Sequence, residues 1–320
     1  LKDTHTGDTL CAQGKDFRLA PINWPKPDIA IAIFPASRGE EDKLANGLNR
    51  VHEEDPTFIA AFDPELGQTI ARGLGELHLN VAMERLKRKF GVNVETEAPR
   101  IAYRETITKK AQGQGRYKKQ TGGRGQYGDC WLRLAPRTRG EGFEFVSKIV
   151  GGVIPSKFVP AVGKGVQEAL SRGILAGYPV VDVAVECYDG SYHAVDSSEQ
   201  AFKVAGSMAF QKVARDARPI ILEPILEVEV RTPEEFMGEV IGDLNQRRGR
   251  IMGMEADGHW QVVKAKVPQA EMYRYSTALR SLTQGKGAHA RDLSGYEPAP
   301  ADVTQKIIAE AEARKEEEHR

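Results

Sequence analysis

The sequence predicts an α+β protein built from several domains. The chain has 320 residues, which corresponds to about two domains of ~150 residues each. Its composition, 40% hydrophobic and 28% charged, is ordinary for globular proteins and sufficient for more than one core. Runs of β-branched residues alternate with amphipathic helical patterns, and the same order of elements occurs near both ends of the chain. The ends are therefore expected to form two similar domains around a third.

Charge and cysteine usage exclude several classes of protein. Lys and Arg number 45, and Asp and Glu also number 45, so a basic field over the whole chain is excluded. The cysteines Cys11, Cys130 and Cys187 lie far apart without a CxxC pair, so neither a disulfide framework nor a zinc site is expected. No apolar run of membrane-spanning length and no signal-peptide pattern occurs. We therefore expect a cytoplasmic protein without a metal or a membrane partner.

The first ten residues resemble a strand or a turn edge that has no earlier element to pair with. A lone strand cannot satisfy its backbone hydrogen bonds or bury both faces. A ragged natural terminus would explain this pattern, but we favour a chain cut from a longer protein.

The first copy of the repeated order covers residues 28–97. It begins with a β-branched strand at 28–34 and a helix opened by Ser37 and Glu40 at capping-box spacing. Strands at 57–62 and 68–71 follow, then an amphipathic helix ended by Gly91 and a strand at 92–97. The order βαββαβ is the split βαβ, or ferredoxin-like, arrangement.

The second copy covers residues 225–293. A strand at 225–230 precedes a helix that Gly249 is expected to stop, and strands at 250–255 and 260–267 flank a hairpin turn. An amphipathic helix and a return strand at 288–293 complete the same order. After two prolines a last helix begins near Asp302, and its charged end from residue 310 is expected to fray into solvent.

Residues 101–222 form a third unit. Strands are expected at 101–107, 130–134, 143–149 and 180–188, and helices at 161–172 and 197–215. Asp196 and Glu199 have capping-box spacing at the start of the second helix.

The stretch 106–128 concentrates positive charge. It holds six Lys or Arg residues, six glycines, Tyr117 and Tyr127, and no acidic residue. We interpret it as one flexible loop that seeks phosphate, with tyrosines that offer stacking faces to unpaired bases. A solvated loop that only keeps the protein soluble is the alternative explanation.

Other motifs are weaker. Gly123, Gly125 and Gly128 match the dinucleotide fingerprint, but an alternating strand follows where that fingerprint requires a helix. No GxxxxGK[ST] loop occurs, so this chain is not expected to hydrolyse GTP or ATP by that route. Residues 191–199 contain Ser, His and Asp, which a turn and a helix cap explain; an esterase-like hydrolase remains the alternative from another class.

Two further features leave alternatives open. His193 precedes the cap in a polar turn, where it either sits exposed beside the basic loop or is an ordinary surface histidine. Arg247 and Arg248 follow a helix, where they either complement the helix dipole or contact RNA phosphates.

Several motifs lie in order along the chain, among them residues 119–128 (KQTGGRGQYG), 151–155 (GGVIP), 175–180 (LAGYPV) and 191–199 (SYHAVDSSE). These four are similar to the fourth domain of elongation factor G, the ribosomal translocase. Residues 222–225 (LEPI) and 242–249, with GDL and RRG, are similar to its fifth. Residues 73–79 (GLGELHL) and 102–107 (AYRETI) are similar to its third domain and the exit from it. The run at 113–119 is closest to the second, divergent bacterial form, and Thr121 and Asp129 depart from the usual Ser and His.

The resemblance implies a domain division. Residues 1–22 would be a remnant of the β-barrel second domain with its linker, and the GTPase domain would be missing. Residues 23–99 and 222–297 would be ferredoxin-like domains three and five, and 298–320 a C-terminal helix with a charged tail. Residues 100–221 would be the ribosomal-protein-like, tRNA-mimicking domain four, with a left-handed βαβ crossover.

The resemblance also implies a function in protein biosynthesis. The parent would be a monomeric, ribosome-dependent GTPase that moves tRNA and mRNA, with GTP and Mg²⁺ held in the missing domain. This part would have no catalytic residue and no cofactor, and its domain-four tip would enter the decoding centre. A paralogue that acts in ribosome recycling or ribosome protection is the alternative within this class. The residues expected to contact RNA or the ribosome are Lys118, Lys119, Gln120, Thr121, Gly122, Gly123, Arg124, Gly125, Gln126, Tyr127, His193, Arg247 and Arg248.

Overall fold

The computed structural model describes residues 4–15, 17–37, 39–120 and 125–318. The chain divides into two compact units, each made of two stretches of sequence. One unit comprises residues 1–101 and 226–293, and the other comprises residues 102–225 and 294–320. In the described part of the chain, no helix is both long enough and apolar enough to cross a membrane. The mixture of helices and several sheets confirms the predicted α+β class.

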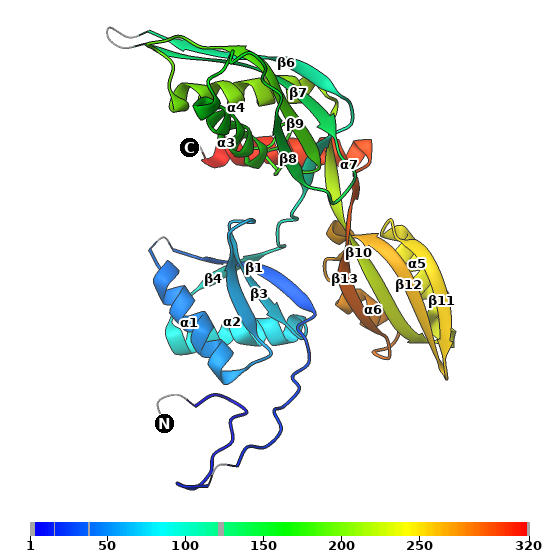
Figure 1. Ribbon diagram of the computed structural model, residues 1–320. Coiled ribbons are helices and arrows are strands. Elements are labelled where there is room, and N and C mark those ends of the chain that lie inside the picture. The colour runs from blue at the N-terminus through cyan, green and yellow to red at the C-terminus, as the bar shows by residue number, and fades with distance from the viewer. Residues whose placement is uncertain (1–3, 16, 38, 121–124, 319–320) are drawn as a thin grey trace. The chain divides into compact units, whose positions relative to one another are not determined.

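The first unit begins with the βαββαβ order that the sequence predicts. Its elements are β1 (Ile29–Pro35), α1 (Glu41–Glu54), β2 (Ile59–Asp63), β3 (Gln68–Gly73), α2 (Glu76–Phe90) and β4 (Val94–Glu97). The strands form an antiparallel sheet in the order β2-β3-β1-β4, and α1 and α2 pack against each other (Figure 1). Ile33, Leu48 and Leu86 belong to the core that the strands share with both helices. Gly91 ends α2 in the left-handed conformation, as predicted.

The predicted capping box at the start of α1 is wrong. The N-cap residue is Glu40, and its side chain makes no capping hydrogen bond. Glu41 and Asp42 lie in the first turn, where their negative charge complements the helix dipole.

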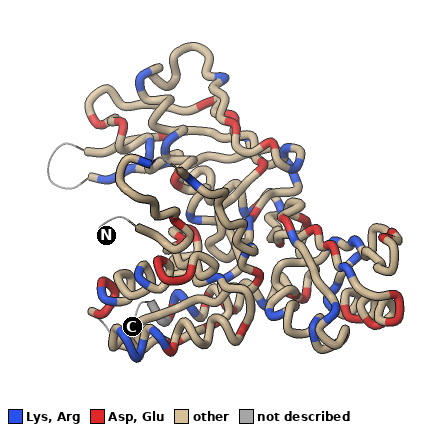
Figure 2. The backbone as a smooth tube through the Cα atoms, turned by 90° about the horizontal axis from the view of Figure 1, so that it is seen from below, with Lys and Arg blue, Asp and Glu red and all other residues tan. Residues whose placement is uncertain are grey.

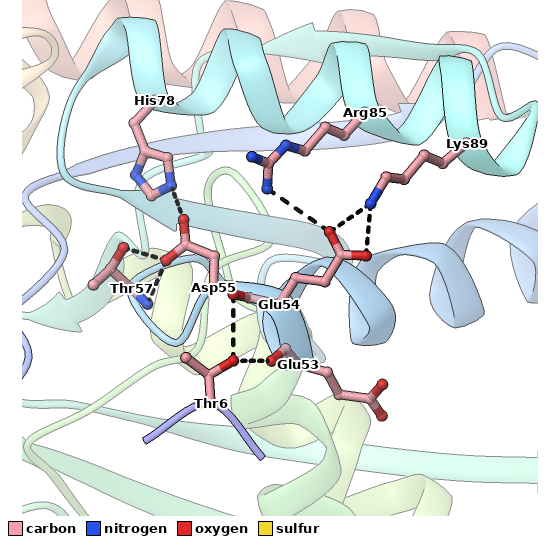
Figure 3. Close-up of polar contacts among 8 residues, drawn as sticks. All are labelled: Thr6, Glu53, Glu54, Asp55, Thr57, His78, Arg85 and Lys89. Atoms are coloured by element: carbon pink, nitrogen blue, oxygen red, sulfur yellow. Dashed lines mark hydrogen bonds and ion pairs between the residues drawn. The ribbon is translucent and has the colours of Figure 1, made fainter. Parts of the chain in front are cut away.

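A polar cluster joins the end of α1 to α2. Figure 3 shows His78 pointing from α2 toward Asp55, with 2.9 Å between Nε2 and the carboxylate. Lys89 of α2 lies 2.8 Å from the Glu54 carboxylate. The backbone N–H of Leu74 donates to Nδ1 of His78 at 3.0 Å, so the ring carries its proton on Nε2 and donates it to Asp55. Thr6 donates to the carbonyl of Glu53 at 2.9 Å, which satisfies one of the last carbonyls of α1.

Asp55 should make this part of the protein sensitive to acid. Partial burial raises the pKa of Asp55, but hydrogen bonds from Thr57 and His78 outweigh it and hold the pKa below its ordinary value. We expect Asp55→Asn to lower the unfolding free energy by about 1 kcal/mol at pH 7, a figure that allows for solvent screening. Because the pKa of Asp55 is lower in the folded state, ionised Asp55 stabilises the fold at pH values above its unfolded-state pKa of about 4. This contribution is lost as the pH falls through the folded-state pKa. The difference between variant and wild type should therefore shrink as the pH falls below about 4.

The measurement is pulse proteolysis in urea at several pH values, with peptides from residues 24–98 read by mass spectrometry. Glu84→Gln, on the solvent-facing side of α2, serves as the control. If the unfolding free energy of Asp55→Asn stays below that of the wild type by the same amount at low pH, the carboxylate charge contributes nothing to stability.

The second copy of the order lies nearer the C-terminus. Its elements are β10 (Pro219–Pro233), the 3₁₀ turn η2 (Glu234–Phe236), α5 (Met237–Gln246), β11 (Arg250–Asp257), β12 (Trp260–Pro268), the 3₁₀ turn η3 (Gln269–Met272), α6 (Tyr275–Leu282) and β13 (Ala288–Pro298). These strands have the order β11-β12-β10-β13. Val228, Val263 and Leu279 are buried in its core. The predicted stop at Gly249 falls one residue late, because Arg248 takes the left-handed position with a φ of 61°.

The second unit contains the middle of the chain. Its elements are β5 (Arg104–Ile107), β6 (Ala111–Lys119), β7 (Gln126–Pro136), β8 (Phe143–Ser147), the 3₁₀ turn η1 (Ser156–Phe158), α3 (Val159–Ser171), β9 (Val183–Ser191) and α4 (Glu199–Asp216). Four strands form a sheet in the order β6-β7-β9-β8, and β5 pairs with Pro219–Leu222 at the start of β10. Strands β8 and β9 are parallel and are joined through α3, which forms a βαβ crossover, and the left hand expected for it stays a prediction. Helices α3 and α4 lie side by side, with α4 against β6 and β7 (Figure 1).

The stretch 106–128 is not the single flexible loop that the sequence suggested. Strands β6 and β7 form an antiparallel hairpin in which Ala111 pairs with Leu134 and Lys119 with Gln126. The glycines of β6 have a steric role: a Cβ on Gly115 would overlap the backbone of α4 at Ala205 and Ala209. Glycine here permits close packing of helix on strand, and composition alone could not separate this role from flexibility.

The last helix is also longer than predicted. Helix α7 (Ala301–Glu318) continues through the charged segment that was expected to fray. Ile307 and Ala311 are buried, and Arg314 donates to the hydroxyl of Tyr178 at 2.9 Å. Contacts within its own unit therefore hold the helix past residue 310.

Candidate nucleic-acid interface

Two neighbouring segments form one end of the β6–β7 hairpin. Strand β6 ends at the exposed residues Lys118 and Lys119, and β7 begins at Gln126. Lys118 pairs with Tyr127 across the hairpin. Gln120 is exposed, whereas Thr121, Gly122, Gly123 and Arg124 lie outside the described residues. This end of the hairpin presents cationic side chains on a rigid strand, which is a suitable geometry for phosphate contact.

The turn after β9 holds the predicted histidine. The side chain of His193 is 56% exposed. Its Nδ1 accepts backbone hydrogen bonds from Val195 at 3.3 Å and Asp196 at 3.2 Å. These two donors require an unprotonated Nδ1, so the neutral ring carries its proton on Nε2. The turn thus displays a hydrogen-bond donor on an exposed ring.

The structure brings this turn against the hairpin. Tyr127 donates its backbone N–H to the carbonyl of Asp196 at 2.9 Å. Ser197 donates its hydroxyl to the carbonyl of Tyr127 at 3.0 Å and accepts from the backbone N–H of His193 at 2.9 Å. Gly125 donates its N–H to the Asp196 carboxylate at 3.1 Å. Hairpin and histidine turn therefore form one surface, which we call the tip: residues 118–119, 125–127 and 193–197.

The predicted capping role of Asp196 is wrong. The N-cap of α4 is Ser198, whose hydroxyl accepts from the N–H of Ala201 at 3.2 Å. Asp196 lies two residues earlier and its carboxylate faces the hairpin, so the spacing identified the helix start but assigned the wrong residue to it.

A half-buried hydrogen-bond network supports the tip. The hydroxyls of Tyr127 and Ser191 lie 2.7 Å apart, and Ser191 donates to the buried Asp129 at 2.6 Å. Gln114 donates to the other carboxylate oxygen of Asp129 at 2.8 Å. The sequence motifs contain these residues but do not predict the network, because strand pairing between β6, β7 and β9 is what brings them together.

The tyrosines differ from the expected pair of stacking faces. Tyr117 packs against the core of its unit, so its ring is part of the fold. Tyr127 lies at the tip with the Arg116 guanidinium 5.3 Å from its ring centre and the His193 ring at 6.4 Å. A cation on an aromatic face adds positive charge to this surface.

Figure 2 shows that Lys and Arg are interspersed with Asp and Glu along the backbone of both units. The distribution agrees with the equal numbers of basic and acidic residues. Any nucleic-acid contact therefore depends on local geometry and not on a general basic field.

Comparison with known proteins gives consistent results along the chain. Sequence models described as "Elongation Factor G, domain III", "Elongation factor G, domain IV" and "Elongation factor G C-terminus" match residues 24–98, 99–218 and 220–307. Elongation factor G of Aquifex pyrophilus is 54% identical over 314 residues, which are 98% of this chain and 45% of that protein. The chain belongs to the elongation factor G family. It spans less than half the length of this relative.

A crystal structure of a protein from Thermus thermophilus is also similar to this chain. It superposes with a TM-score of 0.83 at 46% identity, over 91% of this chain and 44% of that one. The tip falls within the segment that matches domain IV of elongation factor G.

The two remaining predicted site residues lie in the other unit, in the segment similar to the elongation factor G C-terminus. Arg247 donates to Asp243 at 2.8 Å and to the carbonyl of Glu271 at 2.6 Å, and it covers the Tyr275 ring at 5.1 Å. Burial, together with the nearby Asp243, raises the pKa of Tyr275. Arg248 lies 3.5 Å from the Glu271 carboxylate. Arg247 thus has internal contacts that account for its presence, and an RNA role for this pair stays a prediction.

Proposed function

We propose that the protein containing this chain promotes movement of tRNA and mRNA on the ribosome, with GTP hydrolysis in another part of the protein. The chain acts as the ribosome-engaging lever of a cytoplasmic, monomeric, ribosome-dependent GTPase that binds GTP and Mg²⁺ outside it. The tip enters the decoding centre and contacts tRNA and mRNA. The contribution of these residues is positioning and electrostatics, with no covalent chemistry.

The proposal includes a division of the chain. Residues 23–99 and 222–297 relay changes from the GTPase side, and residues 100–221 carry the tip. Residues 1–22 belong to a β-barrel domain with its linker, and residues 298–320 form a helix with a charged tail. Membership of the elongation factor G family supports this division.

One observation carries the proposal. The cationic end of the β6–β7 hairpin and the exposed His193 ring are joined by hydrogen bonds into a single tip. A surface with cations on rigid strands and a fixed donor can hold an RNA backbone in register, whereas an unstructured basic loop would only attract it.

The test uses the full-length protein. We expect Arg124→Ala combined with His193→Ala to slow single-round translocation about tenfold while ribosome affinity changes much less. Translocation is followed by rapid kinetics, and affinity by co-sedimentation with ribosomes across a salt series. Lys118→Ala with Lys119→Ala should weaken the salt-dependent affinity, whereas Lys306→Ala, which removes an exposed charge from α7, should not.

Equal losses of affinity and translocation in the Arg124 and His193 variant would overturn the lever role. Strong ribosome binding without translocation by the wild type would favour the paralogue that acts in recycling or protection, to which the divergent run at 113–119 points.

The hydrolase alternative finds no support in the arrangement of its residues. The hydroxyl of Ser197 donates to the carbonyl of Tyr127, and Nδ1 of His193 already accepts two backbone donors. Ser191 donates to Asp129 instead of to a histidine. A serine nucleophile needs a histidine positioned to take its proton, and neither hydroxyl has one.

A further inference from the structure

Asp196 has an unexpected place for an acidic residue. It lies in the tip, which is otherwise cationic, and its side chain is 26% exposed. A carboxylate beside an RNA-binding surface repels phosphate, so its own charge opposes binding. Asp196 is also not the helix cap that its spacing suggests, because Ser198 fills that position. The role of Asp196 therefore has to follow from the contacts that it makes.

Those contacts reach both segments of the tip. On the hairpin side, Oδ1 accepts the N–H of Gly125 at 3.1 Å, and the main-chain carbonyl accepts the N–H of Tyr127 at 2.9 Å. On the turn side, Oδ2 lies 3.4 Å from Nδ1 of His193, and the backbone N–H of Asp196 donates to that same nitrogen at 3.2 Å. One residue thus fixes the start of β7 and the orientation of the imidazole.

The hairpin is shaped to receive this carboxylate. A Cβ on Gly125 would lie 2.9 Å from Cγ of Asp196 and 3.0 Å from Oδ2. A side chain at position 125 would push the carboxylate aside, whereas glycine lets this residue approach the carboxylate closely. Gly125 and Asp196 therefore form a matched pair, 71 residues apart in sequence.

We propose that Asp196 is a positioning residue that holds the hairpin and the His193 turn in one fixed register for RNA. The inference rests on the proposed function. The negative charge of Asp196 is incidental to this role, which depends on the hydrogen-bond acceptor at Oδ1. Without that acceptor Gly125 loses its hydrogen bond to the turn, and the hairpin is held to the turn through Tyr127, by the main-chain bond and by Ser197, although the cations that attract RNA remain.

This account makes the two obvious substitutions behave differently. Asp196→Asn keeps an oxygen that accepts from Gly125, and its amide N–H can donate to the unprotonated Nδ1 of His193. Asp196→Ala removes the acceptor for Gly125 and offers no such donor. If Asp196 acted only through its charge, the two variants would behave alike. Asn and Ala remove the same charge, so both would strengthen RNA binding.

The experiment measures single-round translocation and ribosome affinity for each variant of the full-length protein. We expect Asp196→Ala to slow translocation about tenfold, with affinity changed less than about twofold and Asn restoring the wild-type rate within about twofold. Asp189→Ala is the charge-matched control, since Asp189 is exposed and its carboxylate accepts the N–H of its neighbour Gly190. It should leave both quantities unchanged.

A double-mutant cycle tests the pair itself. Gly125→Ala displaces the carboxylate, so it should slow translocation much as Asp196→Ala does, and the double variant should be no slower than either single one. Faster amide exchange at Gly125 in Asp196→Ala, with α4 still protected, would show that the register is lost while the fold is kept.

The outcomes separate this inference from the proposed function. A wild-type rate in Asp196→Ala, or slowing by Asn and Ala alike, would overturn the positioning role. If the wild-type protein fails to translocate at all, the proposed function fails, and the exchange result at Gly125 still decides whether Asp196 fixes the hairpin.

Discussion

Glu105→Gln is expected to lower the unfolding free energy of the unit that carries the tip by about 3–5 kcal/mol, because it leaves backbone N–H donors without an acceptor. Glu105 lies in β5 and is 0% exposed. Its Oε2 accepts the N–H groups of Ile174 and Leu175, and Oε1 accepts those of Ala176, Gly177 and Tyr178. A Gln amide keeps one acceptor oxygen and turns two N–H donors toward the other N–H groups. At least two of these backbone donors, which are partly or fully buried, would then lose their partner.

The measurement is pulse proteolysis in urea, read on peptides from residues 102–225, together with amide exchange of residues 174–178. Exchange at these five amides should accelerate in Glu105→Gln before the rest of the unit opens. Glu141→Gln provides the control, because Glu141 is an exposed carboxylate that accepts a backbone N–H from Thr138 at 3.1 Å. The unfolding free energy of Glu141→Gln should stay within about 0.5 kcal/mol of the wild-type value. Equal urea midpoints for the two variants would refute the role assigned to Glu105.

Glu105 also shows how far the sequence could predict this molecule. Periodicity located nearly every strand and helix, because apolar spacing records which face of an element is buried. It could not show that Glu105 lies inside the loop at 174–178, because that contact joins residues about 70 positions apart. Buried polar residues that serve long-range contacts look like surface residues in a one-dimensional pattern.

The tip was predicted in part. Charge density and the family resemblance pointed to Lys118, Lys119 and His193, and the structure brings these segments together. The interpretation of 106–128 as a loop was wrong, because glycine gives the same composition signal whether it supplies flexibility or close packing. Asp196 was assigned to the helix cap for a related reason, since its spacing to Glu199 fits a local explanation that the three-dimensional contacts override.

Gly165→Ala is the second substitution with a large expected effect, because it forces apart the two helices behind the tip. A Cβ on Gly165 of α3 would overlap the carbonyl oxygen of Lys203 on α4. The clash is with backbone, so no side-chain rotation relieves it, and the helices have to separate. Alanine is favoured over glycine within a helix by about 1 kcal/mol. We still expect a net loss of roughly 3 kcal/mol, because overpacking against a rigid neighbour outweighs that gain.

The control for Gly165→Ala is Gly242→Ala in α5, where the added Cβ meets nothing within 4 Å. There only the helix propensity changes, so the variant should be more stable by up to about 1 kcal/mol. Urea unfolding of both variants is read separately on peptides from α3–α4 and from α5. It should show a lower unfolding free energy for Gly165→Ala and a higher one for Gly242→Ala.

The effect at Gly165 also reaches function, since α4 begins directly after the turn that holds His193 and Asp196. Separation of α3 from α4 moves that turn against the hairpin, so translocation should slow even where Gly165→Ala remains folded. A Gly165→Ala protein as stable and as fast as the wild type would show that the α3–α4 contact can relax without moving the tip.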